Sequence, residues 1–153
     1  MIPRIDPKDR ELLALPSVSQ IGVVIKDMHP AMEFYSEVWN VGPFKIFEPE
    51  YTDQTYRGKP GNFKMRIALA PFGPVQLELI EPLEGDTIYG EFLEKNVGGL
   101  HHLGFDVDRI EDRITAMQKM GIGVLQSGKR PGVAFAYMDT EPLTGIIMEF
   151  IER

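Results

Sequence analysis

The chain contains no cysteine among its 153 residues, so it forms no disulfide bonds and offers no thiolate ligand to a metal. Any metal site must therefore be built from nitrogen and oxygen donors. Histidine is also scarce, with three residues, at positions 29, 101 and 102. Cross-links are not needed for stability, because a single domain of this length buries roughly 70% of the surface that its unfolded chain would expose.

Long hydrophobic runs and excess positive charge are absent as well. No apolar stretch approaches the roughly 20 residues of a membrane span, and residues 1–15 lack the uninterrupted apolar core of a signal peptide. The net charge of −7 is unfavourable for binding nucleic acid, whose phosphates must be neutralised by lysine and arginine. We therefore expect a cytoplasmic protein with neither a membrane nor a nucleic acid as its partner.

The sequence does contain an internal repeat. Residues 20–26 (QIGVVIK) are similar to residues 102–108 (HLGFDVD), and residues 75–81 (VQLELIE) are similar to residues 146–152 (IIMEFIE). The first pair places a possible metal donor at equivalent positions, Gln20 and His102. The second pair does the same with the carboxylates of Glu78 and Glu149. Donors at repeated positions suggest one metal held between the two halves.

Each half of the chain reads as a β-α-β-β-β module within a single α+β domain, residues 1–153. The first module, about residues 17–82, is predicted to contain a strand at 18–26, a helix from Pro30 to about 42, and strands at 44–48, 63–70 and 74–81. The second, about residues 98–153, is predicted to contain a strand at 101–107, a helix at 109–120, and strands near 122–126, 133–139 and 145–152. A helix at 86–96, capped by Asp86, links the modules, and a helix at 6–15 precedes them.

The first module is longer than the second, and most of the extra length lies in residues 49–62. A loop of this length in a small domain is often functional. Its Tyr51, Tyr56, Arg57 and Lys59 would suit a lid over an anionic or aromatic ligand. A solvated insertion without a function is the alternative.

Strand alternation supports the grouping of the donors. His102 and Gly104 point to the face opposite Leu103 and Phe105. Gln20 and Gly22 likewise share a face of the first opening strand, where glycine leaves room for a close approach. A single histidine or glutamate on a strand is usually structural or solvated, but four donors related by a repeat favour a metal site. His101 has the opposite parity to His102, so it is not expected in the site.

The doubled plan with these donors resembles the vicinal oxygen chelate superfamily over about residues 17–153. That superfamily includes glyoxalase I, methylmalonyl-CoA epimerase, extradiol dioxygenases and bleomycin-resistance proteins. Residues 98–107 (GGLHHLGFDV) are similar to the second-half opening of methylmalonyl-CoA epimerase, where the second histidine binds metal, and residues 146–151 (IIMEFI) are similar to its last strand. The resemblance implies an incomplete eight-stranded barrel around a metal, and a homodimer. The predicted ligands are Gln20, Glu78, His102 and Glu149.

Two departures from the epimerase pattern bear on mechanism. The epimerases usually bind metal with His, Gln, His and Glu, whereas the Gln-Glu-His-Glu order found here is similar to glyoxalase I of higher organisms. The second proton-transfer glutamate of the epimerases aligns with Arg66, which cannot act as a base at neutral pH. Arg66 would instead bind a substrate carboxylate or phosphate, with Arg57 or Lys59 closing over it, or it is a surface residue.

Two carboxylates, one imidazole and one amide suit one divalent ion such as Zn, Co, Ni, Mn or Mg. Such a site can polarise a carbonyl while a glutamate removes the adjacent proton. Glu149 is the predicted base, with Glu78 as its counterpart. These residues predict a metal-dependent epimerase or isomerase acting on a small molecule such as an acyl-CoA. The alternatives are a lactoylglutathione lyase of the glyoxalase I type and a non-catalytic binding protein. The sequence leaves open whether the site closes within one chain.

Overall fold

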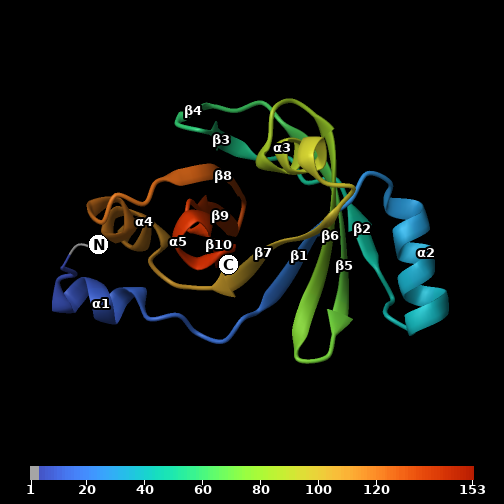
Figure 1. The fold of residues 1–153 in the computed structure, drawn as a ribbon, viewed down its shortest axis with the longest axis horizontal. Coiled ribbons are helices and arrows are strands. Elements are labelled where there is room, and N and C mark those ends of the chain that lie inside the picture. Colours follow the sequence, from blue (N-terminus) through green and yellow to red (C-terminus); the bar gives the residue numbers. More distant parts are fainter. Residues whose placement is uncertain (1–3) are drawn as a thin grey trace.

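The computed structural model describes residues 4–153, which form one curled sheet of ten strands with helices around it (Figure 1). The strand order is β2-β5-β6-β1-β7-β10-β9-β8-β3-β4. The strands are β1 (Gln20–Val24), β2 (Lys45–Phe47), β3 (Thr52–Tyr56), β4 (Lys59–Pro60), β5 (Lys64–Phe72), β6 (Val75–Glu84), β7 (Gly99–Asp106), β8 (Val124–Arg130), β9 (Val133–Met138) and β10 (Ile147–Glu152). The helices are α1 (Pro7–Leu13), α2 (Met28–Trp39), α3 (Ile88–Lys95), α4 (Ile110–Lys119) and α5 (Glu141–Thr144).

The sheet is made of two four-stranded halves that meet at its centre. β1 pairs with β6 in the first half and β7 pairs with β10 in the second, both in parallel, and β1 joins β7 antiparallel. This arrangement confirms the predicted pair of β-α-β-β-β modules in an open barrel. The number of strands exceeds the expected eight because β3 and β4 extend the far edge.

The segment at 49–62 is largely a hairpin rather than the expected loop. β3 and β4 are joined by a two-residue turn in which Arg57 and Gly58 both have positive φ, of 47° and 79°. This conformation matches the turn type that best suits a twisted hairpin. β3 also pairs with β8, so a segment of the first module completes the sheet of the second.

Two helices cover the outer faces of the sheet in equivalent ways. α2 lies over the first half, where Met28 packs against Ala68, Leu77 and Leu79. α4 lies over the second half in the same manner. Its cluster contains Ile110, Ala136, Met138 and Phe150. Alternation along the strands therefore directs the other side chains, including Glu78 and Glu149, to the inner face.

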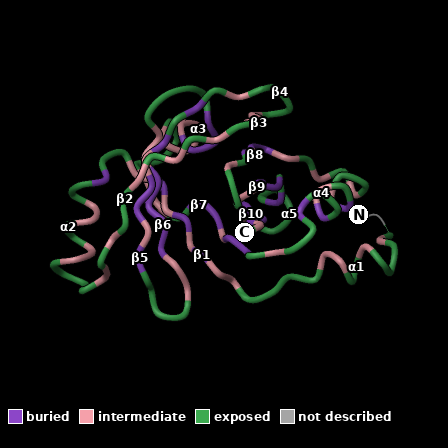
Figure 2. The backbone as a smooth tube through the Cα atoms, turned by 180° about the vertical axis from the view of Figure 1, so that it is seen from behind, coloured by how far each residue is buried: buried purple, intermediate pink, exposed green. Residues whose placement is uncertain are grey.

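The linking helix α3 closes one end of the curled sheet. Its N-cap is Thr87, whose hydroxyl accepts from the Gly90 amide at 3.0 Å, and not the predicted Asp86. The buried Gln126 accepts a hydrogen bond from the Ile88 amide at 2.9 Å, which ties α3 to β8. The inner strands are the most buried part of the backbone, whereas α2 and the loops carry most of the exposed residues (Figure 2). Within residues 4–153, no helix is both long and apolar enough to cross a membrane.

Candidate metal centre

The four predicted donors lie on the four central strands of the sheet, within one chain. Gln20 is on β1, Glu78 on β6, His102 on β7 and Glu149 on β10. The backbone arranges them in two neighbouring rows. One row runs Glu78, Gly22, His102 across the strands, and the next runs Gln20, Gly104, Glu149. Each row thus has a glycine at its centre.

The central glycines make room for the donors. A Cβ atom on Gly22 would lie 1.9 Å from the His102 ring, so no side chain fits there while the imidazole keeps its position. A Cβ on Gly104 would lie 3.0 Å from Gln20 Cβ, which is tight but less severe. The expectation that glycine leaves space for a close approach is confirmed at Gly22.

The donor atoms converge on one point. His102 Nε2 lies 3.3 Å from Glu78 Oε2 and 3.2 Å from Glu149 Oε2, and all three residues are buried. Despite this proximity, Nε2 makes no hydrogen bond with suitable geometry within residues 4–153. Donors that each lie about 2.1 Å from a cation, at right angles, are separated by about 3.0 Å. The spacing therefore fits a small divalent ion bound among them.

The amide of Gln20 adds a fourth donor. Its nitrogen donates to Gln76 Oε1 at 3.0 Å, which leaves its oxygen 3.0 Å from Glu78 Oε2 and 3.2 Å from Glu149 Oε2. Three acceptor oxygens this close repel one another unless a cation lies between them or the amide turns to donate. With a cation among the donors, Gln20 would act as an oxygen ligand, whereas without a cation the turned amide donates to both carboxylates.

His101, which was not expected in the site, lies directly beside one of its donors. The pairing of β1 with β7 shifts register between Gly22 and Val23, so His101 is the extra residue of a β-bulge. The bulge brings His101 Nδ1 to 3.1 Å from His102 Nδ1, in a buried position. If His102 Nε2 binds a cation, its Nδ1 carries the proton and donates to His101, which fixes the ring. Simple alternation could not reveal this contact.

Burial and neighbouring charges set opposite protonation states for the two histidines. For His101, burial and the adjacent His102 lower the pKa to about 3, so this ring stays neutral. For His102, burial lowers the pKa, but the carboxylates of Glu149 and Glu78 outweigh burial and raise the pKa to about 9. Without a metal, His102 is therefore an imidazolium between two carboxylates. A cation must displace this proton in order to bind.

Glu149 is the carboxylate best suited to accept a proton. Its burial raises its pKa above the ordinary value, although His102 partly opposes this shift. The Tyr137 hydroxyl lies against Glu149 and accepts a hydrogen bond from the Tyr89 hydroxyl at 2.7 Å. Burial raises the pKa of both phenols well above the usual value, so they remain protonated donors.

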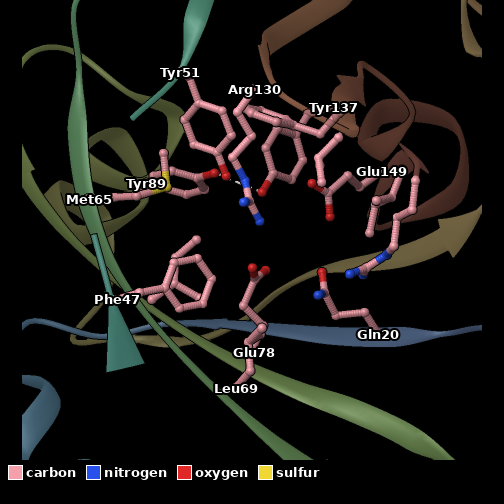
Figure 3. A pocket seen from close by; sticks show the side chains of 15 residues that line it. Gln20, Phe47, Tyr51, Met65, Leu69, Glu78, Tyr89, Arg130, Tyr137 and Glu149 are labelled. Carbon is pink, nitrogen blue, oxygen red and sulfur yellow. Dashed lines mark hydrogen bonds between the residues drawn. The ribbon is translucent and has the colours of Figure 1, made fainter. Parts of the chain in front are cut away.

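A cavity of about 50 Å³ adjoins the donors (Figure 3). Gln20, Glu78 and Glu149 form its polar end, and Phe47, Met65 and Phe135 are among its apolar walls. Tyr51, which was expected in a lid over the ligand, lines the cavity as well. Arg130 also lines it and was missed from the sequence, and Figure 3 shows its side chain reaching into the cavity. Alternation along β8 places Gln126, Gly128 and Arg130 on one face of the strand, and this pattern could have indicated from the sequence that Arg130 faces the site.

Arg66 was expected to bind substrate in the cavity, but it does not line the cavity. On β5 the cavity is lined by Met65, Ile67 and Leu69, so Arg66 points to the outer face. Its guanidinium donates to Glu48 Oε1 at 2.9 Å and to Glu81 Oε1 at 3.0 Å.

The basic residues of the hairpin also lie away from the cavity. Arg57 sits at the hairpin turn and pairs with Glu91 at 3.0 Å. Lys59 is exposed on β4. Pairing of β3 with β8 holds Arg57 and Lys59 outside the cavity. Of residues 49–62, only Tyr51 lines the cavity.

The fold and donor set agree with comparisons to known proteins. Residues 19–137 match the family described as the Glyoxalase/Bleomycin resistance protein/Dioxygenase superfamily. The chain belongs to this superfamily. Members of the superfamily bind a divalent metal, and the buried group of Glu78, His102 and Glu149 could bind one here.

Relatives within the superfamily include an uncharacterized protein and epimerases. The chain is 26% identical over 138 residues to the Bacillus subtilis protein YqjC, covering 88% of this chain and 91% of that one. It is 25% identical over 120 residues to the mitochondrial methylmalonyl-CoA epimerase of Mus musculus, covering 77% of this chain. The match spans 61% of the mouse protein's length.

Solved structures show the same fold. The methylmalonyl-CoA epimerase of Mycobacterium tuberculosis superposes with a TM-score of 0.67 at 19% identity, covering 94% of this chain and 93% of that one. A methylmalonyl-CoA epimerase in complex with methylmalonyl-CoA and NH4+ superposes with a TM-score of 0.66 at 22% identity, covering 91% and 95%. These likenesses confirm the predicted fold.

Proposed function

We propose that the protein is a metal-dependent isomerase that removes and returns a proton next to a carbonyl group. One divalent ion would be held by Gln20, Glu78, His102 and Glu149. The observation that carries this proposal is the convergence of four buried donors, in which His102 Nε2 and the Gln20 amide each lie 3.0–3.3 Å from the carboxylates of Glu78 and Glu149. When bound, the ion would polarise the substrate carbonyl and stabilise the negative charge that develops on its oxygen.

The chain's own residues would handle the proton. Glu149 accepts it, because burial raises the pKa of this carboxyl toward the range in which a general base works best. Tyr137 and Tyr89, both protonated, hold Glu149 in place. Glu78 faces the same cavity from the other module and is the candidate to return a proton to the opposite side of the substrate. Glu78 thus takes the place that the alignment gave to Arg66, which lies on the outer face.

An acyl thioester such as an acyl-CoA is the proposed substrate, by analogy with the epimerase relatives. A lyase of the glyoxalase I type is the second candidate, and the specific observation in its favour is the Gln-Glu-His-Glu donor order. Both reactions use a metal and a carboxylate base, so the site alone favours neither. The expected homodimer is a separate prediction, because all four donors come from one chain and dimerisation is not needed to complete the site.

Metal analysis followed by proton exchange tests the proposal. The protein is loaded with Co²⁺, freed of excess metal and incubated in D₂O with methylmalonyl-CoA or with the methylglyoxal-glutathione adduct. We expect metal-dependent deuterium incorporation into methylmalonyl-CoA. Conversion of the glutathione adduct instead would support the lyase. Stoichiometric metal with no exchange into either compound would reject both activities and leave a binding protein.

A further inference from the structure

Arg130 lines the cavity and forms no ion pair with any of the described residues. Its Nε is buried and makes no hydrogen bond within residues 4–153. The other arginine of the cavity wall, Arg153, is paired with Asp106 at 3.0 Å, and Arg66 on the outer face is paired with two carboxylates. None of the ion pairs in this part of the chain includes Arg130.

The surroundings of Arg130 hold its guanidinium at the cavity. The Phe47 ring lies under it, with 5.7 Å between the guanidinium carbon and the ring centroid. The Tyr51 hydroxyl lies beside it, and burial raises the pKa of that phenol, so it remains a donor. An arginine stacked on an aromatic ring keeps its planar set of donors free for a carboxylate. The Nε of Arg130 is buried without a hydrogen-bond acceptor, and leaving such a donor unsatisfied is costly, which points to an acceptor supplied by a ligand.

The charge of the site predicts the charge of that partner. A divalent ion balances the carboxylates of Glu78 and Glu149, and His102 is neutral when it acts as a ligand. With a metal bound, the cavity would therefore carry one net positive charge, which is that of Arg130. A substrate carrying one carboxylate would neutralise it.

We infer that Arg130 is the anion-binding residue of the cavity, the side chain that would hold a substrate carboxylate beside the reacting carbonyl. This inference rests on the proposed metal-dependent function, because it places the carbonyl at the four donors and the carboxylate at Arg130. The guanidinium binds the carboxylate through two parallel hydrogen bonds, and Tyr51 donates a further one. Substrates without the carboxylate lose this contact.

Calorimetric titration of the Co²⁺-loaded protein with malonate, and separately with the uncharged malonamide, tests the assignment. We expect Arg130→Gln to weaken malonate binding about 10- to 100-fold, the usual effect of losing a charge-assisted hydrogen bond. The affinity of this variant for malonamide should stay within about twofold of the wild-type value. Arg130→Lys, which keeps the charge but not the planar donors, should lie between. Arg66→Gln is the matched control, because it removes an arginine outside the cavity, and it should not change malonate binding.

The outcomes separate this inference from the proposed function. Unchanged malonate affinity in Arg130→Gln, with Co²⁺ bound as in the wild type, would overturn the role of Arg130 and leave the metal site intact. Loss of Co²⁺ from Arg130→Gln would make Arg130 a structural residue and overturn it as well. A wild-type protein that binds no Co²⁺ would reject both proposals.

Discussion

The first module supplies an amide and a carboxylate to the candidate metal centre, whereas the second supplies an imidazole and a carboxylate. Their backbones follow the same plan, with helix α2 or α4 on the outside and a glycine at the centre of each donor row. The second module adds the bulge that places His101 against His102, and it also carries Arg130. The duplicated backbone therefore sets the geometry of the site, and the differing side chains make its two halves chemically different.

The largest difference between the modules is expected at the two central glycines. Gly22→Ala should abolish metal binding and cost about 3 kcal/mol of stability, because the new methyl group would overlap the His102 ring. Gly104→Ala should cost about 1 kcal/mol, since its nearest neighbour, at 3.0 Å, is a side-chain atom. Denaturant unfolding and Co²⁺ titration of both variants check this, and equal effects would contradict the asymmetry.

The two carboxylates provide the second test. Glu149→Gln should keep the fold and most of the metal but slow proton exchange by about 100-fold or more, because an amide cannot accept the proton. The Glu78→Gln variant should still remove the substrate proton, but it should be slow to return a proton to the opposite face of the substrate. Deuterium exchange measured separately from epimerisation distinguishes the two roles. Full exchange in Glu149→Gln would show that another residue is the base.

The protonation of His102 gives a smaller, pH-dependent effect. Its pKa in the folded, metal-free protein is raised to about 9, so its stabilising contribution is complete below the ordinary value near 6.5 and is lost as the pH rises through about 9. A metal competes with this proton. Co²⁺ affinity should thus rise about tenfold per pH unit between pH 7 and 8 and level off near 9. Calorimetry in two buffers of different ionisation enthalpy should detect close to one proton released.

The smallest effects are expected in the β3–β4 hairpin, which has no counterpart in the second module. Arg57→Ala and Lys59→Ala should leave the Michaelis constant unchanged within about twofold, because neither residue lines the cavity. Loss of the exposed Arg57–Glu91 pair should change stability by less than about 1 kcal/mol. Steady-state kinetics with the true substrate check this. A large rise in the Michaelis constant would restore the original hypothesis of a basic lid.

The sequence was most informative where strand alternation and the repeat agree. Gln20, Glu78, His102 and Glu149 were placed opposite the apolar faces of their strands by period-two alternation and at equivalent positions of the two halves by the repeat, and the structure brings them together. Gly22 was expected to leave space, and it does. These features depend on regular backbone geometry, which sequence patterns predict well.

The sequence was less informative where the backbone is irregular or the contact is long-range. The bulge reverses the parity of His101, and nothing local to that segment marks it. The pairing of β3 with β8 involves residues far apart in the chain, so 49–62 was interpreted as a loop. The alignment also gave Arg66 a role that alternation along β5 contradicts, while Arg130 was left without one.

The central claim is that the two modules together bind one divalent ion through four donors. X-ray absorption spectroscopy of the Co²⁺-loaded protein, with its metal content, tests this most directly. We predict one ion per chain, with nitrogen and oxygen ligands at about 2.0–2.3 Å that include a single imidazole, and loss of that imidazole signal in His102→Gln. Failure to bind Co²⁺, or an unchanged spectrum in His102→Gln, would contradict the account.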